Sequence, residues 1–228
     1  MSNPDDALAW VRAPQQARSQ ATLIRFLDAA EELLDEVAFD SLSVQVICER
    51  AESSVGAFYA RFADKTALLH VLHERLCDEA KATVGDTLDA ARWRGVPLAD
   101  IIRGLVGFIV VEYGHRQGLR RELVRRNGTD PAFRIRSVDV AAVTVDRLTH
   151  LLVERRAELN PEREPASAAE FINRLIFGVL DQDAVFADTG PAGVVLGREI
   201  LAEGLTSVVL AWLGTPAAPP APTGPPAP

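Results

Sequence analysis

Apolar residues recur at helical spacing along almost the whole chain, and no stretch of strand length alternates apolar with polar positions. Near the start, Leu23, Leu27, Ala30 and Leu34 follow one another at intervals of four, three and four residues. This spacing predicts an amphipathic helix over about residues 18–37. The sequence therefore predicts an all-α protein.

Residues that can cap helix N-termini divide the next part of the chain. Ser43, Ser54 and Asp64 each precede a run with helical spacing, and their side-chain oxygens can accept a hydrogen bond from a free amide of the first turn. We therefore expect helices over about 44–50, 55–62 and 65–84. Two short helices joined by a tight turn have the lengths typical of a helix-turn-helix.

Longer helices are expected beyond Gly85. The first, over about 97–113, is apolar on nearly every side and contains Gly104 and Gly107, so we expect a buried central helix that also walls a pocket. Others are expected over about 131–159, over 167–187 behind the capping pattern Ser167-x-x-Glu170, and over 194–213. The chain then divides into a loose arm (1–16), a helix-turn-helix domain with its linking helix (17–84), a larger helical domain (85–213) and a disordered Pro- and Ala-rich tail (214–228).

The charge balance opposes a nucleic-acid partner. The chain has 24 basic and 32 acidic side chains and a net charge of −8, so DNA binding would have to depend on a local surface. Much of the acid in the first domain lies between Asp28 and Glu36, where one helix face can turn it away from a phosphate backbone. The charge therefore cautions against DNA binding without excluding it.

The sequence contains no candidate membrane span. Its longest apolar run, Leu105–Val111, is far shorter than the roughly 20 residues that a bilayer requires. Asp5 and Asp6 stand where a signal peptide would be basic and then apolar, so we expect a cytoplasmic protein with its two cysteines as reduced thiols.

The stretch from Ser43 to Lys65 carries the most specific pattern. It contains Val55-Gly56-Ala57-Phe58-Tyr59, then Phe62 and the pair Asp64-Lys65, with Phe26–Ala30 ahead of it and Leu68-Leu69 behind. Over about residues 18–70 the chain resembles the N-terminal domain of the TetR family of transcription regulators. The resemblance implies that the third helix enters the major groove of operator DNA. The residues that it places at the DNA are Val55, Ala57, Tyr59 and Lys65, with Ser43, Gln45 and Ser54 beside them.

Three positions depart from the family pattern. Ala38 and Glu52 stand where a Gly usually ends the first helix and makes the turn, and Ser53 replaces an apolar residue that pins the turn. A left-handed backbone would cost Ala38 or Glu52 about 1 kcal/mol, so one or both could adopt another geometry.

The resemblance implies a homodimeric regulator that binds a palindromic double-stranded operator, most simply a repressor released by a small apolar or amphipathic effector. The first alternative is a protein with this fold that has lost operator binding and serves as a ligand or protein binder. A helical enzyme is the second alternative, but no G-x-S-x-G, H-E-x-x-H or phosphate-loop pattern occurs in the sequence, and we expect no enzyme activity.

The larger domain offers candidate ligand and interface residues. Aromatic side chains that could line a pocket, or simply fill the core, are Phe108, Tyr113, Phe133, Phe171 and Phe177. Two apolar stripes predict a dimer interface, and they consist of Ile172, Leu175, Ile176, Val179 and Phe186 on one helix and Leu201, Leu205, Val208, Val209 and Trp212 on the next. Asp181, Gln182 and Asp183 could hydrogen-bond across the dimer or line the pocket floor.

Two charged clusters allow more than one interpretation. Seven arginines between Arg116 and Arg136 could attract an anionic effector, or could form a solvated face partly paired with Glu122 and Asp130. The helical spacing of His70, His73, Glu74 and Cys77 could bind a metal, but exposed helix faces produce such sets by chance. We therefore expect no metal and no cofactor.

Overall fold

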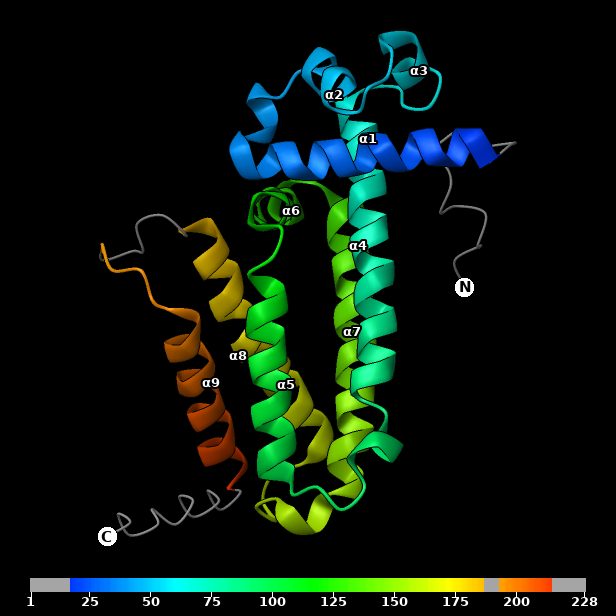
Figure 1. Ribbon diagram of the computed structural model, residues 1–228. Coiled ribbons are helices and arrows are strands. Elements are labelled where there is room, and N and C mark those ends of the chain that lie inside the picture. Colours follow the sequence, from blue (N-terminus) through cyan, green and yellow to red (C-terminus); the bar gives the residue numbers. More distant parts are fainter. Residues whose placement is uncertain (1–16, 187–192, 215–228) are drawn as a thin grey trace, which may run out of the picture.

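The computed structural model describes residues 17–186 and 193–214, and the regular structure within these ranges is entirely helical (Figure 1). The all-α prediction is thus confirmed. The helices are α1 (Ala17–Glu36), α2 (Val44–Arg50), α3 (Val55–Tyr59), α4 (Lys65–Thr87), α5 (Leu98–Tyr113), α6 (Gln117–Thr129), α7 (Pro131–Glu154), α8 (Pro165–Val185) and α9 (Arg198–Leu213), with short 3-10 turns η2 (Phe39–Ser41), η3 (Ala90–Trp93) and η4 (Arg156–Glu158). The expected arm (1–16) and residues 215–228 of the expected tail lie outside the described residues.

The three predicted N-caps of the first domain are confirmed. Ser43 Oγ accepts from the Val46 amide at 3.2 Å, Ser54 Oγ accepts from the Ala57 amide at 3.1 Å, and the carboxylate of Asp64 caps α4. Helix α3 ends at Tyr59 rather than at Phe62, so it is shorter than expected. Phe26, Phe58 and Phe62 are fully buried beneath α2 and α3 and meet edge to face or tilted, which fixes both short helices on α1.

The two positions where the family has glycine behave differently. Ala38 is extended, with φ −64° and ψ 144°, so it avoids the left-handed region. Glu52 adopts φ 48° directly after α2. The Ser53 amide donates to the Cys48 carbonyl at 2.9 Å and the Glu52 amide donates to the Glu49 carbonyl at 3.2 Å, which is the hydrogen-bond pattern of a Schellman C-cap. Glu52 therefore occupies the position that favours glycine.

Helix α4 connects the helix-turn-helix to the larger domain and packs along α7 (Figure 1). Helix α5 packs against α9. Helix α5 was expected to be buried on nearly every side, but only one of its sides is buried. Ile101, Ile102 and Val106 are buried in the core, whereas Phe108 and Val111 are exposed. The helix is apolar on both sides because one side packs in the core and part of the other faces a cavity described below.

Several boundaries of the larger domain differ from those expected. Helix α6 lies in an Arg-rich segment for which no helix was expected, and α7 ends at Glu154. The capping pattern Ser167-x-x-Glu170 is not used. Instead the Glu164 carboxylate accepts from the Ala166 and Ser167 amides, and Pro165 occupies the first turn of α8. The last helix begins at Arg198, after an irregular segment that includes residues 194–197.

Helix α6 joins the two domains. It lies directly beneath the C-terminal end of α1 and is seen end-on in Figure 1. The Gly118 amide donates to Asp35 Oδ1 at 2.7 Å, and a Cβ at Gly118 would lie only 1.8 Å from the Leu34 carbonyl oxygen. Leu119 and Leu123 are buried in the same core as α1. Only glycine permits this close approach of the two helices.

No described helix has both the length and the apolar character needed to cross a membrane.

Candidate nucleic-acid interface and ligand cavity

Helices α2 and α3 project from the side of α1 that faces away from the larger domain (Figure 1). This position exposes Ser43, Gln45, Ser54, Val55 and Tyr59, while Ala57 is half-buried. Tyr59 is 52% exposed, and its ring packs edge to face on Phe58 at 5.4 Å. Gln45 donates to the Glu49 carboxylate at 3.0 Å, so its amide is oriented along α2. These side chains therefore lie on, or at the start of, the two helices that project away from the larger domain.

The structure gives Lys65 a role that the sequence did not reveal. Its ammonium donates to the carbonyl oxygens of Phe39, Asp40 and Leu42 at 3.0, 3.0 and 3.1 Å. It also lies 4.9 Å from the centre of the Phe39 ring. Because an ammonium has three donors, the observed contacts use all of them. Lys65 thus fixes η2 against the start of α4.

The arginines around this surface are also engaged. Arg50 forms ion pairs with Glu32 and Glu36 at 3.3 and 2.9 Å. Arg61 donates to the Ala57 carbonyl at 2.8 Å and to Ser19 Oγ at 3.2 Å, which ties the end of α3 to the start of α1. The outer surface is therefore mainly polar and uncharged, and phosphate binding would depend on hydroxyls and helix N-terminal amides.

A cavity of about 790 Å³ lies between α4 and helices of the larger domain, and its volume is in the range of small-molecule sites. Its walls come from α4, α5, α6, α7 and α8. Apolar side chains line much of it, and they include Leu76, Ala80, Val84, Phe108, Ile109, Leu123, Val124, Val140 and Phe177. Polar groups lie among them, including His73, Tyr113, Arg116, Arg120, Asn127, Ser137, Asn173 and Asp181.

Three of the five aromatic residues expected at a pocket line this cavity, namely Phe108, Tyr113 and Phe177. Phe133 lies instead in the core beneath α1, fully buried and stacked on His70 and His73. Phe171 stacks on Trp212 at 4.3 Å and does not line the cavity. Periodicity marks all five as apolar helix positions but does not show which core each one joins.

Sequence reasoning did not place His73, Asn127, Ser137 or Asn173 at the cavity. The Ser137 hydroxyl donates its single hydrogen to Asn127 Oδ1 at 3.0 Å, so its oxygen accepts from His73 Nε2 at 3.2 Å. His73 Nδ1 and Asn173 Oδ1 are buried and find no hydrogen-bond partner among the described residues. Burial lowers the pKa of His73 to about 4, and nearby Arg136 and His70 act in the same direction. His73 is therefore neutral at pH 7.

A second polar group lies where α5, α6 and α8 meet. The Tyr113 hydroxyl donates to Asp181, and the Arg120 guanidinium lies 4.1 Å from the centre of the Tyr113 ring. Burial raises the pKa of Tyr113 and of Asp181 and lowers the pKa of Arg120. Asp181 was expected at the dimer interface or the pocket floor, and the structure places it in the pocket wall.

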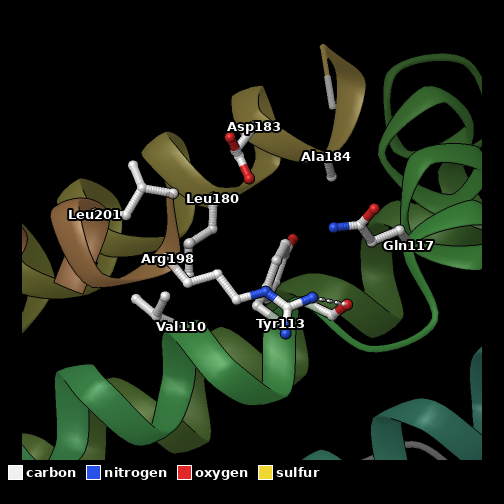
Figure 2. A pocket seen from close by; sticks show the side chains of 9 residues that line it. Val110, Tyr113, Gln117, Leu180, Asp183, Ala184, Arg198 and Leu201 are labelled. Atoms are coloured by element: carbon white, nitrogen blue, oxygen red, sulfur yellow. Dashed lines mark hydrogen bonds between the residues drawn. The ribbon is translucent and has the colours of Figure 1, made fainter. Parts of the chain in front are cut away.

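A second and much smaller space is lined by residues of α5, α8 and α9, including Tyr113 and Arg198 (Figure 2). It measures about 20 Å³, which is enough for a single water. The Arg198 side chain reaches across it from α9 and donates to the Gly114 carbonyl at 2.8 Å. Arg198 therefore connects α9 to the end of α5, and the space is too small to be a ligand site.

The histidines of α4 do not form a metal site within the described residues, where no group of three candidate ligands comes together. The two apolar stripes also differ from expectation, because Ile172, Leu201, Leu205 and Val209 are buried in the core of the chain itself. Val208 alone among the α9 stripe is half exposed, at 50%.

Comparison with known proteins agrees with this architecture. Residues 26–72 match the model for bacterial regulatory proteins of the tetR family. The HTH-type transcriptional regulator UidR of Escherichia coli K12 is 25% identical over 175 residues, which cover 72% of this chain and 83% of UidR. Salmonella enterica GusR has a TM-score of 0.61 and 21% identity, with 85% of this chain and 95% of GusR covered. SmeT, solved in complex with triclosan, has a TM-score of 0.64 and 21% identity, with 84% and 91% covered. Residues 26–72 thus form a helix-turn-helix domain of the tetR type, and the curated relatives that the longer chain resembles are HTH-type transcriptional regulators.

Proposed function

We propose that this protein is a homodimeric repressor that binds a palindromic operator and is released when a small amphipathic molecule fills the 790 Å³ cavity. One observation carries the proposal. Arg116 lines the cavity, and its guanidinium forms ion pairs with Glu31 of α1 at 2.7 Å and with Glu79 of α4 at 2.5 Å. A single side chain thus connects the ligand space with the helix that supports the helix-turn-helix.

The DNA-binding roles follow from exposure and position. With α3 in the major groove, Val55 and Gln45 reach base edges and Ala57 leaves room for the close approach. Ser43, Ser54 and Tyr59 contact phosphates, together with the first amides of α2 and α3. Lys65 acts indirectly, because its ammonium holds the η2 carbonyls and so fixes the orientation of α2.

The ligand roles fall to the cavity aromatics. Phe108, Tyr113 and Phe177 contact the ligand directly. Phe133 acts from behind the wall, since it stacks on His73 at 5.1 Å, and Phe171 supports α8 through Trp212. The fold relative SmeT, which was solved with bound triclosan, supports the idea that this fold admits a small molecule.

Release would operate through α4 and α6. Both helices wall the cavity, and α6 is docked on α1 through Gly118 and Asp35. A ligand that displaces either helix would move α1 and change the separation of the two recognition helices in a dimer. We accordingly assign DNA binding to residues 17–84 and ligand binding and dimerisation to 85–213, with α4 shared between them.

The dimer would form through α8 and α9. Their exposed sides carry Phe171, Ile200 and Val208, and on α9 small residues at Gly204 and Ala211 permit close helix packing. The buried stripe residues beside them hold each protomer together.

Selection of bound fragments from a random DNA pool with the purified full-length protein tests the proposal. We expect enrichment of one palindromic sequence whose half-sites lie about one helical turn apart. The acidic first domain and the engaged Lys65 favour the alternative, a ligand binder that has lost operator binding. A pool that stays random after repeated selection would establish that alternative.

A further inference from the structure

We propose that the effector of the cavity carries an anionic group, most simply a carboxylate, and that Arg120 binds it. This inference rests on the proposed effector site and specifies its chemistry. The sequence contains seven arginines between residues 116 and 136, and the structure separates those that are engaged elsewhere from those that face the cavity.

Five of the seven arginines lie outside the cavity wall. Arg125 and Arg126 form ion pairs with Glu122 and Asp40, and Arg121 donates to the Ala184 carbonyl at 3.2 Å. Arg136 lies 3.1 Å from His70 Nδ1, and Arg134 is exposed on α7. Arg116 and Arg120 remain, one helical turn apart on the cavity side of α6.

These two arginines differ in their partners. Arg116 already forms ion pairs with Glu31 and Glu79. Arg120 donates to the carbonyls of His115 and Glu112 over 3.4 and 3.5 Å and lies against the Tyr113 ring. Among the described residues, no carboxylate forms an ion pair with it. Arg120 is thus the cavity cation whose charge lacks a direct counter-ion.

Among the described residues, no carboxylate of the cavity wall contacts the Arg120 guanidinium directly. Glu79 is paired with Arg116, and Glu112 is exposed to solvent. Asp181 accepts the hydroxyl hydrogen of Tyr113, and it stabilises the charge of Arg120 only at longer range, without a direct ion pair. Burying a cation without an ionic partner is costly, so a ligand anion would supply the missing charge and could accept two parallel hydrogen bonds from the guanidinium.

The rest of the cavity defines the remainder of the ligand. Apolar side chains from four helices line it and would enclose an apolar body, and they include Phe108, Ile109, Leu123, Val140 and Phe177. At the same time an anion at Arg120 would lie one turn from Arg116, where it competes with Glu31 for that guanidinium. The ligand charge would therefore weaken the contact between α6 and α1 that the repressor form requires.

Isothermal titration of the full-length dimer with matched probes tests this inference without DNA. The probes are decanoate, phenylbutyrate and naphthoate, each compared with its primary amide and its primary amine. We expect at least one carboxylate to bind about 10- to 100-fold more tightly than its amide, because charge-assisted hydrogen bonds are the stronger ones. Arg120→Met should remove this difference, and Arg120→Lys should retain part of it.

Arg134→Met is the matched control, because Arg134 is exposed and lies outside the cavity, so its loss should leave carboxylate affinity unchanged. Amides or amines that bind the parent as tightly as the carboxylates would overturn the anionic class while leaving the effector site intact. Equal carboxylate affinity in folded Arg120→Met would overturn the role of Arg120. If no probe binds, the cavity fails as an effector site, and operator binding, which is measured separately, is unaffected.

Discussion

Glu52 occupies a backbone conformation that costs a residue with a Cβ about 1 kcal/mol, because its φ of 48° lies in the left-handed region. Glu52→Gly should therefore raise the free energy of unfolding by about 1 kcal/mol. Ala38→Gly is the control, since Ala38 is extended and has no strain to lose. That variant should lower the stability slightly. Urea denaturation at a fixed protein concentration measures both, and equal effects of the two changes would argue against strain at Glu52.

His73 makes stability depend on pH. Its pKa is about 4 in the folded protein and about 6.5 in an unfolded chain, so only the unfolded chain takes up the proton between these values. The contribution of His73 is fully present above pH 6.5 and is lost as the pH falls toward 4. Between pH 7 and pH 5 the parent should lose about 2 kcal/mol more than His73→Phe, whose ring can still stack on Phe133. Parallel pH profiles of unfolding free energy would contradict this assignment.

The close packing of helix α6 on helix α1 can be tested by adding a side chain at their contact. Gly118→Ala places a methyl group against the Leu34 carbonyl and should destabilise the protein by about 1–3 kcal/mol, because the two helices must separate. Gly128→Ala lies on the same helix, where an added Cβ meets no atom within 4 Å, and should stabilise it by about 0.5–1 kcal/mol. Thermal unfolding of the two variants distinguishes them, and a neutral Gly118→Ala would show that α6 does not dock so closely.

The elements that local sequence determines were the ones that could be predicted. Ser43, Ser54 and Asp64 cap their helices as expected, because a cap needs only a side-chain oxygen and the amides of the next turn. Glu164 and Pro165 also mark the start of α8 locally, as an N-cap and a first-turn proline. The capping-box pattern of Ser167 and Glu170 instead predicted a start two residues later. Helix α6 was not predicted because its four arginines obscure the short apolar stripe that contains Leu119 and Leu123.

Features that depend on tertiary contact could not be predicted. An apolar position such as Leu205 or Phe133 can face a protomer core, a partner or a cavity, and helical periodicity is the same in all three cases. Lys65 illustrates the same limit for polar residues, because its three carbonyl partners belong to residues more than twenty positions earlier. His73 and Ser137 of the polar cavity wall come from α4 and α7, which meet only in the folded chain.

The whole molecule should be a dimer held by the exposed sides of α8 and α9. Val208→Glu should convert it to monomers, because a charge would be buried at the interface, while each protomer stays folded with Val208 half exposed. Val153→Glu is the control, since Val153 is similarly exposed, at 54%, on α7. Sedimentation velocity separates the outcomes. A dimeric Val208→Glu variant of unchanged stability would place the interface elsewhere.

Operator recognition is the central claim, and an equilibrium titration of the selected duplex against a scrambled duplex of equal length tests it most directly. At one fixed salt concentration the parent should prefer the selected sequence by about a thousandfold or more. Tyr59→Phe should weaken both complexes about three- to tenfold while preserving this ratio, because a phosphate contact does not read bases. Val55→Ala should instead reduce the ratio. If the parent bound both duplexes with the same affinity, the protein would not be a sequence-specific regulator.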